Sequence, residues 1–368
     1  MKCIIFFPSI ENCGPTNVVL SIINNISLDS VDIYAVYLWG ADKKNEELLK
    51  DKCNVILKLD GFGFKSFVKF KEFIKEIKPD IIHSHCFVPD VFTGLVSKFT
   101  KKLNVKTLST VHCNLKEDYF TEYRKIKAFF FLNIHKFFLL KFNSVVTVSN
   151  SAAECLKEID CKTIYNGINE LGLDVTVKEQ AKGINVFFIG RLIPRKNVSF
   201  LIDSLGEYNY KHNTSISLHI FGDGVELLSL KNRSANHVVF HGFTDSPLEF
   251  ANSKTILVNP AFSEGMPMAV LESISVGVPA LLSNIKSHRE IKEIIPIGVS
   301  LFDFNYSDFE KSLNSIVNEF FFDEAKNREL MYSYFSSTFT SLVLSNRYFT
   351  EYKNIISSRN TQDDEVFK

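Results

Sequence analysis

The sequence predicts an α/β protein made of two doubly wound, Rossmann-like domains with parallel sheets. Short runs rich in β-branched and aromatic residues alternate with helical patterns along the chain, which is typical of βαβ units. The 368 residues exceed what one hydrophobic core usually supports, and 45% of them are hydrophobic. The alternation stops once, in a polar stretch after residue 170, and restarts at 184. These observations favour two domains over one.

The elements follow from the apolar pattern, taken in order along the chain. The first domain is predicted over 1–178, with strands at 3–7, 31–38, 54–59, 81–84, 106–111 and 144–148. The second domain is predicted over 184–340, with strands at 184–189, 217–221, 238–241, 255–259 and 279–282 and helices at 197–205 and 268–276. The boundary is placed near 175–183. A last helix over 341–360 is expected to pack back on the body, and 361–368 form a frayed polar tail.

The topology also predicts where a ligand binds. Ligands of open parallel sheets bind outside the carboxyl ends of the strands. We therefore expect the two sheets to face each other across a cleft, with functional motifs placed directly after strands.

Composition excludes several classes of protein. The 42 basic and 42 acidic residues give a formal net charge of zero, which offers no electrostatic case for a nucleic-acid partner. Seven scattered cysteines without a Cys-x-x-Cys pair argue against zinc and favour a reducing cytoplasm. The apolar N-terminus meets Pro8 and then Glu11, too soon for a signal peptide. No run of about 18 apolar residues occurs, so no transmembrane helix is expected.

The most informative motif places two acids around the start of a helix. Glu264 lies in the loop before Pro267, and Glu272 lies about five residues into the helix predicted to begin at Met268. The free amides and positive dipole end of a helix N-terminus favour phosphate. One acid could therefore hold a sugar and the other a ribose. The alternative is that the two are unrelated acids on a loop and a helix surface.

Two further loops follow the first strand of each half. Arg191 and Lys196, in Gly190-Arg191-x4-Lys196, combine a planar fork of donors with a compact charge, which suits a diphosphate; the alternative is a solvated basic turn. In the first half, Gly14 opens a helix and would let the backbone approach a ligand closely, or it is an ordinary loop glycine. Two short glycine motifs most often indicate turns: Gly222-Asp223-Gly224 and Asn166-Gly167.

Histidines lie at two strand ends of the first domain. His112 is the best catalytic candidate there, because it could hydrogen bond a sugar hydroxyl or the reacting centre. His83 and His85 are expected to point to different faces, so that one lies in the core. A structural role is the alternative for each histidine. No carboxylate pair accompanies them, so we do not expect a metal site.

These motifs together resemble the retaining family-4 glycosyltransferases with the GT-B fold. The resemblance covers most of the chain and is strongest from 184 to 290. It implies that Arg191 and Lys196 clamp the donor diphosphate, that Glu272 binds the ribose, and that Glu264 binds a sugar hydroxyl. It further implies that Gly14 lies near the donor phosphate and His112 near the sugar's C6 and reacting face. The remaining donor-binding residues that it implies are Gly222, Gly265, Met266, Met268 and Ala269.

The N-terminal loop departs from the family pattern. The family often has two glycines followed by a basic residue, whereas Cys13 and Asn17 stand at the first-glycine and basic positions here. This departure weakens the expectation that the loop contacts acceptor or phosphate.

The resemblance implies transfer of a hexose or N-acetylhexosamine from a nucleotide diphosphate sugar, with UDP favoured, to a hydroxyl of a glycan or lipid-linked acceptor. The anomeric configuration is retained, and the pathway is synthesis of a surface polysaccharide: O-antigen, capsule or exopolysaccharide. No cofactor or metal is expected, because Arg191, Lys196 and the helix N-terminus supply positive charge and no Asp-x-Asp occurs.

Other functions remain open on the same residues. A sugar-nucleotide epimerase of this architecture would also need acids and bases at the site. A non-catalytic nucleotide-sugar binding protein would bind donor without turnover. A nicotinamide-dependent oxidoreductase is disfavoured, because no Gly-x-Gly-x-x-Gly follows a strand.

A basic, aromatic segment suggests peripheral contact with the inner face of a membrane. Residues 98–141 contain ten Lys or Arg against three acids, interleaved with Phe129, Phe130, Phe131, Phe137 and Phe138. This pattern suits an anionic lipid surface and would fit a lipid-linked acceptor. The alternative is that the aromatic residues form helix core while the lysines are a solvated face.

Overall fold

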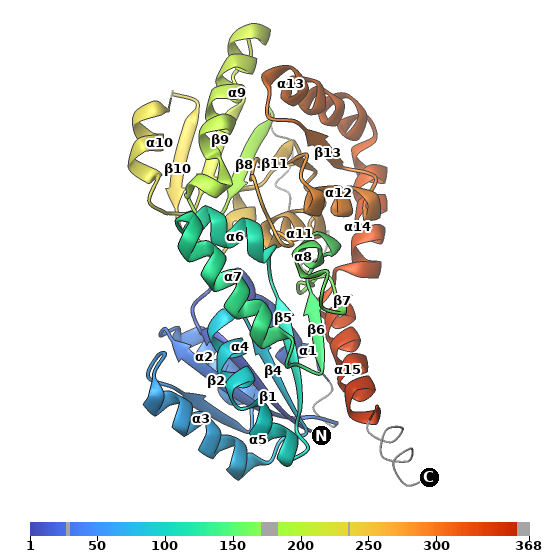
Figure 1. Cartoon of the computed structure of the whole chain (residues 1–368). Helices are drawn as coiled ribbons and strands as arrows, with labels where there is room; N and C mark the ends of the chain where they lie inside the picture. The colour runs from blue at the N-terminus through green and yellow to red at the C-terminus, as the bar shows by residue number, and fades with distance from the viewer. Residues whose placement is uncertain (27–29, 171–182, 235, 359–368) are drawn as a thin grey trace. The chain divides into compact units, whose positions relative to one another are not determined.

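The computed structural model describes residues 1–26, 30–170, 183–234 and 236–358 (Figure 1). The chain divides into two compact units, one made of Met1–Asn169 with Phe339–Lys368 and the other of Glu170–Thr338. The predicted boundary at 175–183, apart from Gly183, and the predicted tail at 361–368 lie outside the described residues.

The described part of the first unit contains a parallel sheet in the order β3-β2-β1-β4-β5-β6-β7. Its strands are β1 (Lys2–Ser9), β2 (Asp32–Trp39), β3 (Val55–Lys58), β4 (Ile81–His85), β5 (Lys106–Val111), β6 (Ser144–Thr147) and β7 (Cys161–Thr163). Its helices are α1 (Gly14–Asn25), α2 (Lys43–Lys52), α3 (Phe64–Ile77), α4 (Phe87–Leu95), α5 (Ser97–Lys102), α6 (Leu115–Glu122), α7 (Lys125–Leu139), α8 (Asn150–Ala153), the short η1 (Glu154–Leu156) and α15 (Ser341–Ser357).

The described part of the second unit contains a parallel sheet in the order β10-β9-β8-β11-β12-β13. Its strands are β8 (Asn185–Ile189), β9 (Ser217–Phe221), β10 (Val238–Gly242), β11 (Thr255–Asn259), β12 (Ala280–Ser283) and β13 (Val299–Phe302). Its helices are α9 (Val198–His212), α10 (Leu227–Arg233), α11 (Met268–Ser275), α12 (Lys286–Ile294), α13 (Tyr306–Ser315), α14 (Glu324–Thr338) and the short η2 (Pro194–Lys196), η3 (Pro247–Phe250), η4 (Ile316–Phe320) and η5 (Phe321–Asp323).

The strand order reverses once in each sheet, and this position locates the candidate sites. The chain moves outward from β1 to β3 and then returns to place β4 beside β1. In the same way it moves from β8 to β10 and returns to place β11 beside β8. A crevice opens at such a switch point outside the carboxyl ends of the two central strands. The loops after β1, β4, β8 and β11 therefore border the two crevices.

The predicted fold class is confirmed, because both sheets are parallel and each of the eleven predicted strands is present. The central strands are buried almost throughout, as expected of strands covered on both faces; residues 3–7 and 255–259 have no exposed member. Two strands were not predicted, β7 and β13, and both lie at sheet edges.

The last helix, α15, belongs to the first unit, far from its place in the sequence. It lies beside α1, where the Ser345 hydroxyl donates to the backbone carbonyl of Ser21 at 3.1 Å (Figure 1). Tyr348 and Tyr352 are fully buried, and their hydroxyls hydrogen bond Thr110 at 2.8 Å and His83 at 2.6 Å. The core of the first unit is therefore completed by the end of the chain.

We predict that Tyr352→Phe destabilises the protein by about 1–3 kcal/mol, because it leaves the buried Nδ1 of His83 without its hydrogen-bond partner. Urea denaturation measures the change. Tyr210→Phe is the control, since that ring is 91% exposed and its loss of a hydroxyl should stay within about 0.5 kcal/mol. Equal unfolding free energies for the two variants would contradict the assigned role of the Tyr352 hydroxyl.

Candidate functional site

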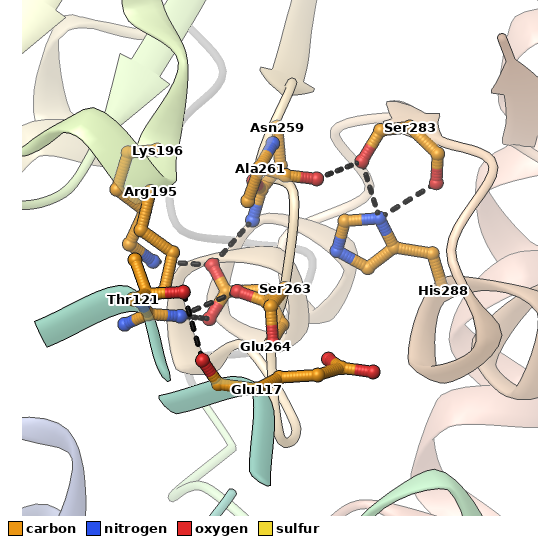
Figure 2. Close-up of polar contacts among 10 residues, drawn as sticks. All are labelled: Glu117, Thr121, Arg195, Lys196, Asn259, Ala261, Ser263, Glu264, Ser283 and His288. Atoms are coloured by element: carbon orange, nitrogen blue, oxygen red, sulfur yellow. Dashed lines mark hydrogen bonds and ion pairs between the residues drawn. The ribbon is translucent and has the colours of Figure 1, made fainter. Parts of the chain in front are cut away.

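The loops after β8 and β11 meet at the switch point of the second unit. The parallel pairing of the two strands, with Asn185 opposite Thr255, brings their carboxyl ends to the same edge. The first loop continues into η2, which carries Arg195 and Lys196, and the second carries Glu264 (Figure 2). The amide of Phe262 donates to the carbonyl of Arg195 at 2.9 Å, so the two loops are also joined through their backbones.

Glu264 is the centre of this arrangement. Its carboxylate is only 7% exposed and accepts hydrogen bonds from Arg195 Nη1 at 3.3 Å, from Lys196 Nζ, and from Asn259 Nδ2 at 3.3 Å. Arg195 also donates to the backbone carbonyl of Ser263. A buried carboxylate without partners would be strongly unfavourable, and here two cations and an amide compensate it.

The electrostatic balance keeps Glu264 ionised. Burial alone raises the pKa of this carboxyl group, and it is the largest single effect. The Lys196 ammonium and the Arg195 guanidinium together outweigh burial and lower the pKa from 4.5 to about 2. At neutral pH the site therefore presents a fixed anionic acceptor, suited to the O–H groups of a sugar.

The two cations that the sequence singled out occupy different environments. Lys196 pairs with Glu264, whereas the Arg191 side chain is exposed and makes no hydrogen bond or ion pair with a described residue. Arg195, to which no role was assigned, makes the second ion pair. The motif lies in the loop that contacts Glu264, but its linear spacing does not reveal which arginine turns towards the acid.

A second set of hydrogen bonds holds the far side of the Glu264 loop. The Ser283 hydroxyl at the end of β12 donates to the carbonyl of Ala261 at 2.6 Å (Figure 2). His288, at the start of α12, contacts the carbonyl of Ser283 through Nδ1 at 2.8 Å. His288 is fully buried, and burial lowers its pKa to about 4. Neither residue was predicted from the sequence, because neither forms a recognisable motif.

The predicted helix start is present, with a small difference. Pro267 is the N-cap residue of α11, and the first helical residue is Met268, followed by Ala269. Met266 is buried, as is the preceding Gly265. The loop that leads to the helix is thus part of the folded core.

Glu272 differs from Glu264 in its surroundings. It lies in α11, is half-buried, and its carboxylate makes no hydrogen bond or ion pair with a described residue. Burial raises its pKa. The two acids of the motif thus differ in their partners. Glu264 is bound by cations, whereas the Glu272 carboxylate is available to a group that can donate hydrogen bonds.

Gly222 has a structural reason to be glycine. Its φ is +140°, and a Cβ at this position would lie 1.9 Å from the carbonyl oxygen of Gly190. The loop after β9 therefore packs directly on the loop that carries Arg191. Gly222 supports the shape of the basic loop, and its predicted contact with donor stays a prediction.

In the first unit, Gly14 and His112 lie after β1 and β5, the two strands that flank β4. Gly14 is the first residue of α1, after β1, and His112 follows β5. His112 Nε2 lies 2.9 Å from His85 Nδ1, and burial lowers the pKa of His112 to about 4. The imidazole of His112 is therefore neutral near pH 7 and can either donate or accept a hydrogen bond.

The expectation for His83 and His85 is wrong. Residues two apart on a strand point to the same face, and the two ring centroids lie 4.1 Å apart. Both rings are fully buried, so both belong to the core. In the described ranges, no group of three or more His, Cys, Asp or Glu is arranged to hold a metal ion.

We predict that the stabilising effect of Glu264 depends on pH. Because its folded pKa of about 2 is below the unfolded value, its contribution is complete at neutral pH and declines as the pH falls through 4.5 towards 2. Glu264→Gln should therefore lose on the order of 3 kcal/mol at pH 7. The difference from wild type should narrow by about 1 kcal/mol at pH 3.5, measured by urea denaturation at both values. A difference that is constant between the two pH values would contradict the assigned pKa.

Known proteins match both units. Residues 16–170 match the family described as glycosyltransferase family 4, and residues 175–328 match the one described as glycosyl transferases group 1. The O-antigen biosynthesis glycosyltransferase WclY of Escherichia coli is 24% identical over 374 residues, which cover 97% of this chain and 98% of that protein. The capsular polysaccharide biosynthesis glycosyltransferase CapH of Staphylococcus aureus is 26% identical and covers 64% of this chain and 68% of its own length.

Solved structures agree with the sequence matches. The crystal structure of Anabaena HepE in complex with UDP superposes with a TM-score of 0.76, at 14% identity, and covers 96% of this chain and 100% of that one. At this identity the likeness concerns the fold alone. Together with the family matches over both units, it shows that the chain belongs to the GT-B glycosyltransferases of family 4 and group 1.

Proposed function

We propose that this glycosyltransferase is a retaining enzyme that moves a hexose or N-acetylhexosamine from a nucleotide diphosphate sugar to a hydroxyl of a glycan or lipid-linked acceptor. The observation that carries the proposal is the buried Glu264 carboxylate, held ionised by Arg195 and Lys196 beside the start of α11. An anionic acceptor, clustered cations and free helix amides match the sugar, the diphosphate and the charge that develops on the leaving group.

The proposed roles follow from the surroundings of each residue. Arg191, exposed and without a partner among the described residues, is available to a diphosphate, as is Lys196 once a donor anion competes with Glu264 for it. Glu272 is open to accept hydrogen bonds from ribose hydroxyls. The neutral imidazole of His112 is proposed to hydrogen bond a hydroxyl of the transferred sugar.

Relatives support the choice of donor and pathway. HepE was crystallised with UDP, so a uridine diphosphate sugar is the favoured donor. WclY and CapH are named for O-antigen and capsule synthesis, which supports a surface polysaccharide as the product. The scattered cysteines support a cytoplasmic location.

We predict turnover of a nucleotide sugar without added metal. A panel of UDP- and GDP-sugars is tested with a lipid-linked acceptor. The rate of product formation should be unchanged by excess EDTA, because Arg191, Arg195 and Lys196 supply the positive charge. Lys196→Ala should lower kcat/KM by about 100-fold, the usual loss for one group that stabilises transition-state charge. Lys326→Ala, in α14, is the control that should retain activity.

The outcome also separates the rival functions. Loss of activity in EDTA that is restored by a divalent cation would reject metal independence. An epimerised sugar nucleotide formed without acceptor would indicate an epimerase. Donor binding without any turnover would indicate a binding protein.

We further propose that the segment from α5 to the end of α7 rests on an anionic membrane surface. One face of α7 is buried against the first unit through Ala128, Leu132, His135 and Leu139, and His135 is fixed by Asp90 at 2.8 Å. The other face exposes large apolar side chains: Ile126 at 88%, Phe129 at 64%, Phe130 at 63%, Phe137 at 57% and Leu140 at 61%. The alternative that the aromatic residues form helix core therefore holds only in part, for Phe131 and Phe138.

The charges around this apolar face favour lipid as its occupant. The same segment of the chain exposes six cations: Lys98, Lys101, Lys102, Arg124, Lys125 and Lys127. An anionic interface would attract these cations while the phenylalanine rings enter the headgroup region. No helix of the described chain is long and apolar enough to cross a membrane.

We predict that the protein floats with vesicles that contain anionic phospholipid and not with phosphatidylcholine vesicles. Phe129→Ser combined with Phe130→Ser should reduce flotation at least tenfold, because two exposed rings are lost from the interface. Phe64→Ser is the matched control, since Phe64 is 80% exposed in the same unit but lies at the start of α3. Equal flotation of all three proteins, or none by the wild type, would reject the membrane surface.

A further inference from the structure

Beside Glu264, the structure contains a buried hydrogen-bond acceptor that has no partner. The atom is Nε2 of His288, whose side chain is fully buried. It finds no hydrogen-bond partner among the residues that the structure describes. An unsatisfied polar atom in a protein interior is costly and calls for an explanation.

The hydrogen bonds around His288 fix its tautomer. Ser283 has a single hydroxyl proton, and it donates that proton to the carbonyl of Ala261 at 2.6 Å. His288 Nδ1 faces two acceptors, the carbonyl oxygen of Ser283 at 2.8 Å and its Oγ at 3.2 Å. Nδ1 must therefore carry the proton, since a carbonyl oxygen can only accept.

The protonation state then defines Nε2. Burial holds the pKa of His288 at about 4, so near pH 7 the ring is neutral and Nε2 is a bare lone pair. Such an atom can only accept a hydrogen bond. Its missing partner is thus an O–H or N–H group.

The ring presents this acceptor towards the loop that carries Glu264. In Figure 2 the second ring nitrogen of His288 lies on the side that faces the Asn259–Glu264 segment, opposite the side bound to Ser283. The Ser283 hydroxyl links the ring to this segment, because it donates to the Ala261 carbonyl and lies 3.2 Å from His288 Nδ1. The Glu264 loop thus carries an anionic acceptor, and α12 places a neutral one beside that loop.

We propose that His288 Nε2 accepts a hydrogen bond from a hydroxyl or amide N–H of the transferred sugar, and so helps to select the sugar. This inference rests on the proposed function and adds a residue to its sugar-binding site. Glu264 and His288 would read two different polar groups of the ring, whereas the cationic loop reads only the diphosphate. A site that hydrogen bonds a sugar group rejects an analogue without it, because the protein atom is then left unpaired.

Two substitutions of His288 distinguish the roles of its two ring nitrogens. In His288→Asn the amide nitrogen can replace Nδ1 as donor to Ser283, and the acceptor at Nε2 is lost. In His288→Gln the amide oxygen can reach the position of Nε2. His237→Asn, at a partly buried histidine beside Gly206, is the matched control.

The test compares binding of a UDP-sugar with binding of UDP, by calorimetry on the full chain. We expect His288→Asn to weaken binding of the sugar nucleotide about tenfold and to leave UDP affinity unchanged, with recovery in His288→Gln. Equal affinity of wild type and His288→Asn for the UDP-sugar, or parallel losses for UDP and UDP-sugar, would overturn the proposal. If the wild type binds no nucleotide sugar at all, the proposed function itself is rejected. This result can be distinguished from the two outcomes that overturn only the role of His288.

Discussion

The parallel pairing of β8 with β11 is the constraint on which the candidate site depends. It brings together two loops that are almost seventy residues apart in sequence and gives Glu264 its two cations. The dependence is mutual. The carboxylate can be buried only because Arg195 and Lys196 neutralise it, and η2 is held against the Glu264 loop by those same ion pairs. The left-handed Asn197 and the close approach of Gly222 to Gly190 then fix the path of the basic loop. Contacts within the protein therefore hold Glu264 and η2 in place.

Much of the fold could be predicted from sequence because parallel strands are covered on both faces and read as continuous apolar runs. The missed strands, β7 and β13, are short edge strands that lack this signal. Cys161-Lys162-Thr163 is polar, and Val299-Ser300-Leu301-Phe302 alternates. The end of α9 was also underestimated, since the predicted 197–205 continues to His212. Helix propensity in the sequence does not locate the end of a helix when its last turns are stabilised by packing against a neighbouring element.

The site could be predicted only as far as linear motifs reach. Glu264, Glu272 and Lys196 lie in spacings that can be recognised in the sequence. Arg195 and Asn259 act through the direction of a side chain in a folded loop, which spacing does not encode. His288 is more instructive, because a lone histidine after a strand is usually structural. Here the role proposed for His288 depends on the Ser283 hydroxyl, which donates its proton to the Ala261 carbonyl. This contact can be seen only in the folded structure.

The place of α15 has a consequence for the order in which the protein can be completed during synthesis. The tyrosines that close the core over Thr110 and His83 are made after the whole second unit. On the ribosome, the unit that emerges first must therefore wait, with one face of its sheet and of α1 uncovered, until residues 341–357 are released. The second unit faces no such delay. Domains usually fold in the order of their synthesis, but here the unit that is synthesised first is completed last. Chaperones that bind exposed hydrophobic residues would therefore act on the first unit of the nascent chain.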